Sequence, residues 1–399
     1  MTAVSIFTGA GGLDIGIERA GGDVLSTLEI HPSYCTTVRN MKAKGVVNPR
    51  TGRAYFQNAK IIQGDIRDMS AGDLLGRRKS VDCLIGGPPC QAFSSAGKQN
   101  SIFDARGTLV YEYFRLLKEI RPKAFLFENV RGLVTAKGAT DEPGEVLKGL
   151  LALFQDAGYS CRVKLLNSAD YGSPQRRVRC FILGSSIAAA PEFPRPTHAV
   201  APVDSLFEPE RLKKWVTLGD YLAQNADTNR AHWILPTAKL AQALSALPDG
   251  KGLRSRGVAE ATRPGGHWGY RQGTFIADQT KPARTVTGSS SQDWIRLPDG
   301  TLRRLTLKEV AGLQGFPSEW EFAGSTADQY QQVGNAVPTI FGEVLGRALA
   351  DYLAGGWRQC PRRNDIDISA DIERSIRYTK YDNMKNGAFR ARAKRTGSA

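Results

Sequence analysis

A short apolar stretch followed at once by a glycine-rich loop sets the strongest limit on how this chain can fold. Residues 3–7 have the pattern of a strand, Gly9, Gly11 and Gly12 come directly after it, and apolar residues at helical spacing continue through Ile17. This order is typical of a nucleotide-binding βα unit, in which glycines bring backbone N–H groups close to a ligand at the helix N-terminus. The spacing is not the G-x-G-x-x-G of dinucleotide-binding folds, and a glycine loop alone is a weak signal. We therefore predict an α/β fold and look for further ligand groups at later strand ends.

Two later strands end in carboxylates. Val24–Leu28 leads to Glu29, which is well placed to accept hydrogen bonds from both ribose hydroxyls of a nucleoside, although a solvated loop acid is an equal alternative. A further strand at residues 61–63 leads to Asp65, which could accept from an adenine amino group while Ile66 packs on the ring. Because no Walker-type lysine follows the glycines, the three strand ends together predict a pocket for an adenosine that needs no phosphate.

A cysteine follows the most rigid turn in the chain. The apolar run Val81–Ile85 leads into Gly86-Gly87-Pro88-Pro89-Cys90-Gln91, and the glycines and prolines fix the backbone of this turn. Most cysteines are buried and inert, but a thiol on a stiff turn at a strand's carboxyl end has the position of a nucleophile. The loop from Ser94 to Arg106 is small, flexible and basic, which favours a flap that closes over a substrate.

Charged residues also mark two strands further along. Glu128 ends the strand Ala124–Phe127, and burial beside the Cys90 strand predicts a raised pKa and a proton-donor role. Alternatively, this acid caps the next turn. Arg177 and Arg179 lie two residues apart, so a strand would present both on one face to a carboxylate or a base carbonyl; a solvated edge strand is the alternative.

The βαβ rhythm stops near residue 190, after which prolines mark a linker. Residues 190–326 are rich in loops, with aromatic side chains beside basic ones, which favours contacts to base edges and phosphates over a plain loop-rich subdomain. A glycine turn at Gly334 could then return to complete the first pocket. We divide the chain into a catalytic domain (1–189, closed by 327–356), a recognition domain (190–326) and a basic tail (357–399), which we expect to be mobile alone and to settle on nucleic acid.

Composition limits the partners. The net charge of +15 and the clustering of basic residues favour a polyanion, in practice nucleic acid, over a merely soluble basic protein. Six scattered cysteines without a C-x-x-C pair and four separate histidines argue for a reducing compartment and against a metal site. No apolar run approaches the roughly 18 residues of a membrane span, and a strand-like start predicts no signal peptide. We expect a cytoplasmic, nucleoid-associated protein without membrane contact.

Five motifs in order resemble one family, the DNA (cytosine-5) methyltransferases, from the first strand to about residue 355. They are Phe7-x-Gly9-x-Gly11-Gly12, Gly87-Pro88-Pro89-Cys90-Gln91, Glu128-Asn129-Val130, Gln175-Arg176-Arg177-Val178-Arg179 and Gly334-Asn335-Ala336-Val337-Pro338. The resemblance implies a Rossmann-like S-adenosylmethionine-dependent methyltransferase domain with a mixed, mostly parallel sheet, and a smaller loop-rich target-recognition domain. It implies S-adenosyl-L-methionine as the cofactor.

The resemblance also implies roles for single residues. Cys90 would attack carbon 6 of cytosine, Glu128 would protonate or hydrogen-bond ring nitrogen 3, and Arg177 with Arg179 would hold the base and the carboxylate. The cofactor pocket would be lined by Phe7, Gly9, Gly11, Gly12, Leu13, Glu29, Ile30, Asp65, Ile66, Pro88, Leu109, Asn335 and Ala336. The candidate DNA contacts are Gln91, Ser94, Lys98 and Arg106 in the flap and Arg254, Arg256, Arg263, His267, Tyr270 and Arg271 in the recognition domain.

The implied substrate is double-stranded DNA, from which the target base must swing out into the site. We expect a stand-alone, monomeric prokaryotic or phage modification enzyme, with a cognate restriction endonuclease as a functional partner. One departure is Ser5, where many family members carry an aspartate, which puts a helper hydrogen bond in doubt. Two alternatives stay open: a transfer-RNA cytosine-5 methyltransferase of the same fold, whose usual Cys-Phe-Thr signature is absent here, and a catalytically dead binding module.

Overall fold

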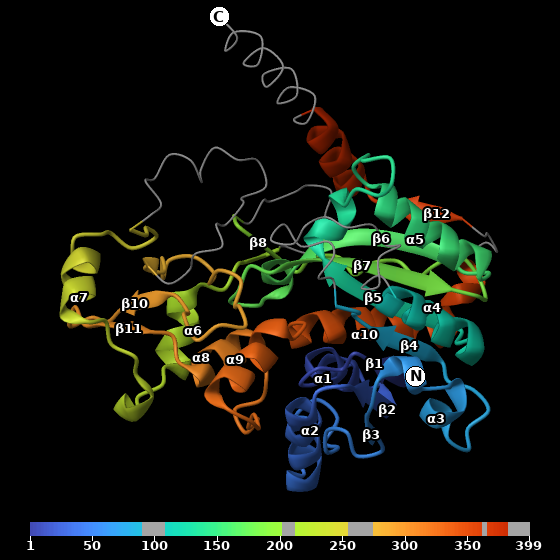
Figure 1. Cartoon of the computed structure of the whole chain (residues 1–399), viewed down its shortest axis with the longest axis horizontal. Helices are drawn as coiled ribbons and strands as arrows, with labels where there is room; N and C mark the ends of the chain where they lie inside the picture. The colour runs from blue at the N-terminus through green and yellow to red at the C-terminus, as the bar shows by residue number, and fades with distance from the viewer. Residues whose placement is uncertain (90–107, 202–211, 254–273, 361–364, 382–399) are drawn as a thin grey trace, which may run out of the picture.

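The computed structural model describes residues 1–89, 108–201, 212–253, 274–360 and 365–381. Its centre is an eight-stranded sheet in the order β12-β6-β7-β5-β4-β1-β2-β3 (Figure 1). Only β7 runs antiparallel to its two neighbours, so the predicted mixed, mostly parallel sheet is confirmed. The strands are β1 (Thr2–Ile6), β2 (Asp23–Glu29), β3 (Lys60–Gln63), β4 (Cys83–Gly86), β5 (Ala124–Val130), β6 (Ser160–Asn167), β7 (Val178–Ser185) and β12 (Ile366–Ile368).

Helices cover both faces of this sheet because successive strand residues point to opposite sides. Ala3 belongs to the apolar core on one face, and Val4 belongs to the core on the other. The first face carries α1 (Gly12–Arg19), α2 (Pro32–Lys44) and α10 (Thr339–Leu353), and the second carries α3 (Ala71–Leu75), α4 (Thr108–Ile120) and α5 (Glu145–Asp156).

Helices α1 and α10 pack with their backbones almost in contact. A Cβ added to Gly16 would lie 2.1 Å from the carbonyl oxygen of Thr339, and one added to Gly342 would lie 2.2 Å from that of Leu13. Only glycine permits such an approach. Helix α10 is thereby fixed against the first βα unit.

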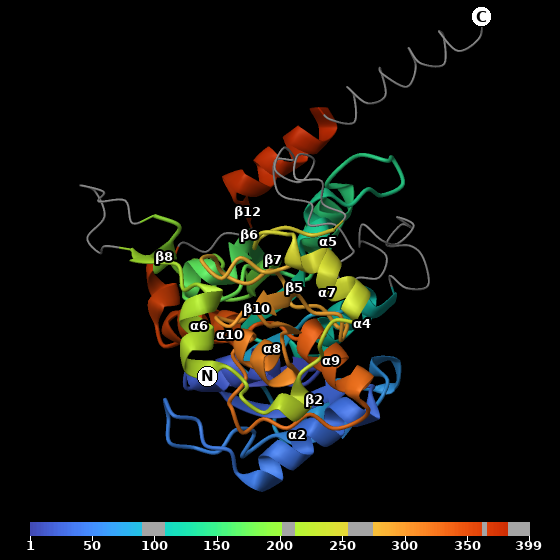
Figure 2. The same ribbon diagram turned by 90° about the vertical axis from the view of Figure 1, so that its left-hand side faces the viewer.

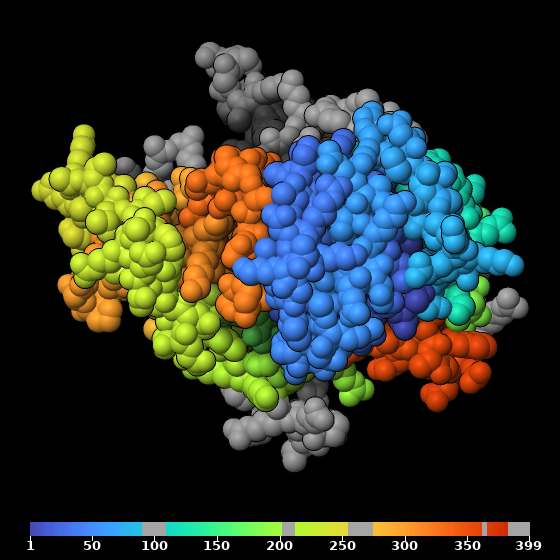
Figure 3. All heavy atoms as spheres, turned by 90° about the horizontal axis from the view of Figure 1, so that it is seen from below, coloured from blue at the N-terminus to red at the C-terminus, as the bar shows by residue number. Residues whose placement is uncertain are grey.

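The segment before α10 is the helix α9 (Thr326–Asn335), which lies between the N-terminal layer and the described part of residues 212–253 (Figure 3). The side chain of Gln332 accepts a hydrogen bond of 2.6 Å from Thr37 of α2. The prediction of a glycine turn at Gly334 is wrong, because this residue is helical. Glycine is required there for space: an added Cβ would lie 2.1 Å from the backbone of Thr287 and Gly288.

The described part of residues 190–326 forms small elements in front of the main sheet in Figure 2. Leu244, Ile276, Trp294 and Leu302 make a small core of their own, whereas Leu218 and Val310 belong to the core on the α1 and α10 face. A buried ion pair between Arg303 and Glu309 (2.6 Å) supports this part. An isolated parallel bridge between Ala283 and Gln175 links this part to the residues before β7. The elements are β8 (His198–Ala199), β9 (Lys213–Lys214), α6 (Leu218–Asn225), α7 (Ala238–Ser245), β10 (Trp294–Arg296), β11 (Leu302–Arg304) and α8 (Leu307–Leu313).

The chain after α10 is more structured than its composition predicts. Strand β12 pairs in parallel with β6 and extends the sheet, and residues 370–381 form a helix. Ile372 of this helix is fully buried in the core on the α4 and α5 face. The expectation of a tail that is mobile on its own from Trp357 is therefore wrong for residues 365–381.

Candidate active site

The turn that precedes Cys90 lies against Glu128. Strands β4 and β5 are neighbours, with Gly86 opposite Phe127. One residue further, a Cβ added to Gly87 would lie 2.6 Å from Oε2 of Glu128, so this turn passes directly over the carboxylate. The side-chain amide of Asn129 donates to the carbonyl oxygen of Pro88 (3.2 Å) and ties the turn to β5. Cys90 itself lies outside the described residues.

The environment of Glu128 suits a proton donor. Only 8% of this residue is exposed, and Nε of Arg179 lies 3.1 Å from its Oε1. Burial raises the pKa of Glu128, while the charges of Arg179 and Arg177 act in the opposite direction. The prediction of a raised pKa is confirmed in its direction. A carboxyl with a raised pKa beside a guanidinium can hold a proton and hydrogen-bond a ring nitrogen.

Arg177 is placed differently from its neighbour. It lies one residue before β7, is 3% exposed, and donates to the carbonyl oxygens of Val286 and Gly334 at 2.8 Å each. Burial and the nearby charge of Arg179 lower the pKa of Arg177, and Glu128 opposes this. Arg177 therefore joins the catalytic sheet to the loop before β10 and to the end of α9.

A buried amide network beside Arg177 was not predicted. The side chain of Gln175 accepts from Val286 N (2.8 Å) and donates to the side-chain oxygen of Gln314 (2.9 Å). Gln314 in turn donates to the carbonyl oxygen of Val333 (2.7 Å) in the last turn of α9. The signal in the sequence was Gln175 itself, the uncharged polar residue that opens the Gln175-to-Arg179 motif. When such an amide is buried, it must find hydrogen-bond partners.

Glu29 braces the glycine loop at the opposite edge of the site. Its Oε2 accepts from the backbone N–H of Gly9 (2.8 Å) and its Oε1 from that of His31 (2.9 Å). Gly9 has a φ of 60°, and a Cβ there would meet nothing within 4 Å, so the loop is open on this side. Ile30 is 53% exposed next to this opening. An exposed apolar side chain beside a carboxylate and an open loop fits the ribose and adenine of an adenosine.

Asp65 caps the short 3-10 helix that follows β3, accepting from Arg67 N at 3.0 Å, and its carboxylate also pairs with the Arg67 guanidinium. These hydrogen bonds lower the pKa of Asp65 to about 2. Near the glycine loop, Ala336 lies beside Gly12, with 3.1 Å between its Cβ and one added to the glycine. The other predicted pocket residues are distributed as follows: Phe7 has a φ of 56°, Leu13, Ile66 and Pro88 are buried, Leu109 is half-buried, and Asn335 is exposed.

Ser5 and Asp14 lie behind the loop. Ser5 is buried and accepts a hydrogen bond from Thr8 Oγ1 (3.2 Å), so its hydroxyl supports the loop from within. Asp14 is also buried, and burial raises its pKa to about 7 against the effect of the Ser5 hydroxyl. Asp14 was not predicted as a site residue, although an acid three residues after Gly11 in an otherwise apolar helix was a visible signal.

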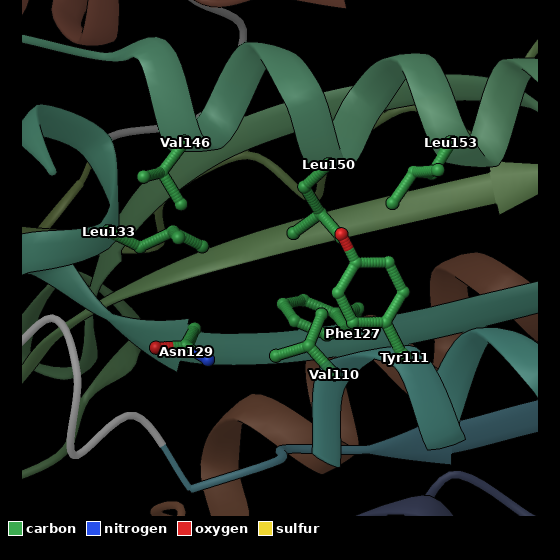
Figure 4. Close-up of a pocket in the computed structure, with 8 residues that line it drawn as sticks. All are labelled: Val110, Tyr111, Phe127, Asn129, Leu133, Val146, Leu150 and Leu153. Atoms are coloured by element: carbon green, nitrogen blue, oxygen red, sulfur yellow. The ribbon is translucent and has the colours of Figure 1, made fainter. Parts of the chain in front are cut away.

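A small apolar pocket opens between α4 and α5 on the far side of Asn129 (Figure 4). Its lining is mainly aliphatic and aromatic, which does not suit the polar groups of a nucleoside. Among the described residues, no three His, Cys, Asp or Glu side chains meet in a way that could hold a metal ion, and no helix is both long and apolar enough to cross a membrane.

The structure does not describe the residues predicted to contact DNA. All of them lie outside the described residues: Gln91, Ser94, Lys98, Arg106, Arg254, Arg256, Arg263, His267, Tyr270 and Arg271.

Comparison with known proteins agrees with this arrangement. The chain is 31% identical over 361 residues to the Type II methyltransferase M1.HphI of Haemophilus parahaemolyticus, covering 88% of this chain and 86% of that protein. It is 32% identical over 349 residues to M.Sau96I of Staphylococcus aureus, covering 87% and 75%. A crystal structure of a putative DNA modification methyltransferase encoded within an E. coli prophage has the same fold, with a TM-score of 0.63, 20% identity, and coverage of 89% and 99%. The family model for C-5 cytosine-specific DNA methylases matches residues 1–351, and the chain therefore belongs to this family and is a DNA (cytosine-5) methyltransferase.

Proposed function

We propose that this enzyme methylates carbon 5 of a cytosine in a specific double-stranded DNA sequence, with S-adenosyl-L-methionine as the donor and a transient bond between Cys90 and the base. The observation that carries the proposal is the buried Glu128, paired with Arg179 and in contact with the turn that leads to Cys90. If Cys90 follows this turn closely, the nucleophile, the proton donor and the arginine that pairs with it would meet at one edge of the sheet.

The cofactor would bind across the carboxyl ends of β1, β2 and β3, beside the point between β1 and β4 where the strand order reverses. Glu29 would accept from the ribose hydroxyls, Ile30 would cover the adenine, and Gly9 leaves room for the ligand at the loop. S-adenosyl-L-methionine supplies an electrophilic methyl group. Closing the pocket would require Asn335 and Ala336, which the Arg177 contact to Gly334 holds in position.

Carbon 5 of cytosine is a poor nucleophile, and the proposed residues correct this. The Cys90 thiolate adds to carbon 6, while Glu128 donates a proton or hydrogen bond to ring nitrogen 3 and Arg179 keeps the carboxylate in place. The electron pair released toward carbon 5 would form its new bond to the methyl carbon while the bond from that carbon to the sulfonium sulfur breaks, and S-adenosylhomocysteine would leave as the neutral thioether. Loss of the carbon-5 proton to a base then expels the thiolate and restores the aromatic ring. The base must leave the duplex to reach this site.

The direct test measures methyl transfer from labelled cofactor to duplex DNA, with transfer RNA as the comparison substrate. Cys90→Ser should abolish transfer while DNA binding persists, and DNA with 5-fluorocytosine should give a stable covalent adduct because fluorine cannot leave as a proton. Full activity of Cys90→Ser would exclude the covalent route. Bisulfite sequencing of DNA from cells expressing the protein would give the target sequence, and we propose that a restriction endonuclease of that specificity is its functional partner.

A further inference from the structure

The C-terminal helix, defined as residues 370–381, is anchored firmly to the catalytic domain. Ile372 is buried, and Ile376 packs on the loop before α5, where a Cβ added to Gly144 would lie 2.8 Å from it. Lys380 forms an ion pair of 2.6 Å with Glu142 of the same loop. With β12 in the sheet, these contacts give the helix a defined orientation.

The outer face of this helix is basic and aromatic. Arg374, Arg377, Tyr378 and Tyr381 are exposed and spaced i, i+3, i+4 and i+7, so they form one stripe. Tyr378 and Tyr381 are 47% and 61% exposed. Within residues 370–381, Glu373 is the one acid that is fully on the surface. Two exposed tyrosines beside two arginines on one helix face combine hydroxyl donors with positive charge.

The C-terminal helix shares a core with the segment that follows the Glu128 strand. Ile372 and Ile376 share a core with Leu133 and Val134, which belong to the 3-10 helix Arg131–Thr135 that directly follows the Glu128 strand. In both Figure 1 and Figure 2 the C-terminal helix stands at the upper edge of the molecule beside α5, away from α2. A helix of twelve residues spans about 18 Å, comparable to about five base pairs of DNA.

The sequence that follows continues the same charge. Residues 382–399 contain five basic residues and one acid. In the sequence, the stripe therefore begins a longer basic stretch, and it begins on the helix that shares a core with the segment after the Glu128 strand. Arginine guanidinium groups and tyrosine hydroxyls are suited to phosphate oxygens, which carry no sequence information but fix the register of a protein on a duplex.

We propose that the outer face of the C-terminal helix binds the phosphate backbone of duplex DNA flanking the target base. The proposal rests on the proposed function for the identity of the reaction. Its test measures DNA binding alone and does not depend on that reaction. The occupant is duplex DNA rather than a protein partner because the stripe and the sequence after it are basic and the substrate is a polyanion.

The test compares binding of a duplex of arbitrary sequence, without cofactor, over a range of salt concentrations. Each lost phosphate contact should lower the slope of log K against log salt by about 0.9, so Arg374→Gln with Arg377→Gln should lower it by about 1.8. The matched control is Arg77→Gln with Arg78→Gln, two exposed arginines after α3, which should keep the wild-type slope. Arg374→Lys with Arg377→Lys keeps the charge and should restore most of the slope.

An unchanged slope in the Arg374/Arg377 glutamine pair would overturn the proposal, as would an equal fall in the control pair or a full fall in the lysine pair. At saturating DNA the glutamine pair should methylate at the wild-type rate. If the wild-type protein itself transfers no methyl group, the proposed function fails, while the difference in slope still decides the role of the helix.

Discussion

Replacing Gly334 with alanine tests whether the end of α9 and the loop before β10 are locked together as the structure indicates. The added Cβ would lie 2.1 Å from the backbone of Thr287 and Gly288, whereas ordinary contacts begin near 3.4 Å. Neither segment can move away easily, because Arg177 donates to the carbonyl oxygen of Val286 in one and of Gly334 in the other. Overpacking of this kind costs about 3 kcal/mol at the upper end of its usual range, and alanine regains about 1 kcal/mol of helix propensity. We expect a net loss of about 2 kcal/mol.

The free energy of unfolding is measured by urea denaturation, and cofactor affinity by calorimetry with S-adenosyl-L-methionine. Because Asn335 and Ala336 follow directly, the Gly334→Ala variant should also bind the cofactor more weakly. Gly72→Ala is the control, since a Cβ there meets only Ser70 Oγ at an ordinary 3.6 Å, and it should be neutral or slightly stabilising. Wild-type stability and affinity in Gly334→Ala would refute the packing argument.

Three further changes have defined outcomes. Glu128→Gln should lower methyl transfer by about 10²- to 10⁴-fold, the usual contribution of a positioned proton donor, while DNA affinity measured by anisotropy stays the same. Asp14 binds its proton more tightly in the folded state, where its pKa is about 7, than in the unfolded state, so the free energy of unfolding should fall as pH rises from about 4 toward 7. The slope of this decline is at most about 1.4 kcal/mol per pH unit. In urea titrations the Asp14→Asn variant should show a flatter decline. Truncation after Tyr381 should lower the salt slope of DNA binding without loss of thermal stability, whereas truncation after Trp357 should destabilise the protein, because it removes β12 and the buried side of the C-terminal helix.

The parts of the fold that the sequence predicted are those encoded locally. The strand, the glycine loop and the helix of residues 3–17 follow one another directly in the sequence. The strand that contains Glu128 has its own apolar run. A carboxylate near the carboxyl end of a central strand is buried by its neighbours, so even the direction of its pKa shift followed from its place in the pattern, although β5 continues two residues beyond Glu128 to Val130.

The parts that were missed depend on distant partners. Arg177 contacts carbonyl groups 109 and 157 residues away, and nothing in its own neighbourhood of the sequence specifies them. Strand β12 is only three residues long in a polar setting, so its place in the sheet comes from pairing with β6 and not from its own pattern.

Arg177 and Arg179 show how one short motif serves two needs. Arg179 reaches the carboxylate of Glu128, while Arg177 uses two separate nitrogens to hold two carbonyl groups from different parts of the chain. A lysine carries its charge at a single nitrogen and could not reproduce this planar fork. The loop before β10 and the end of α9 are therefore both held by Arg177, which lies two residues before Arg179, the partner of Glu128.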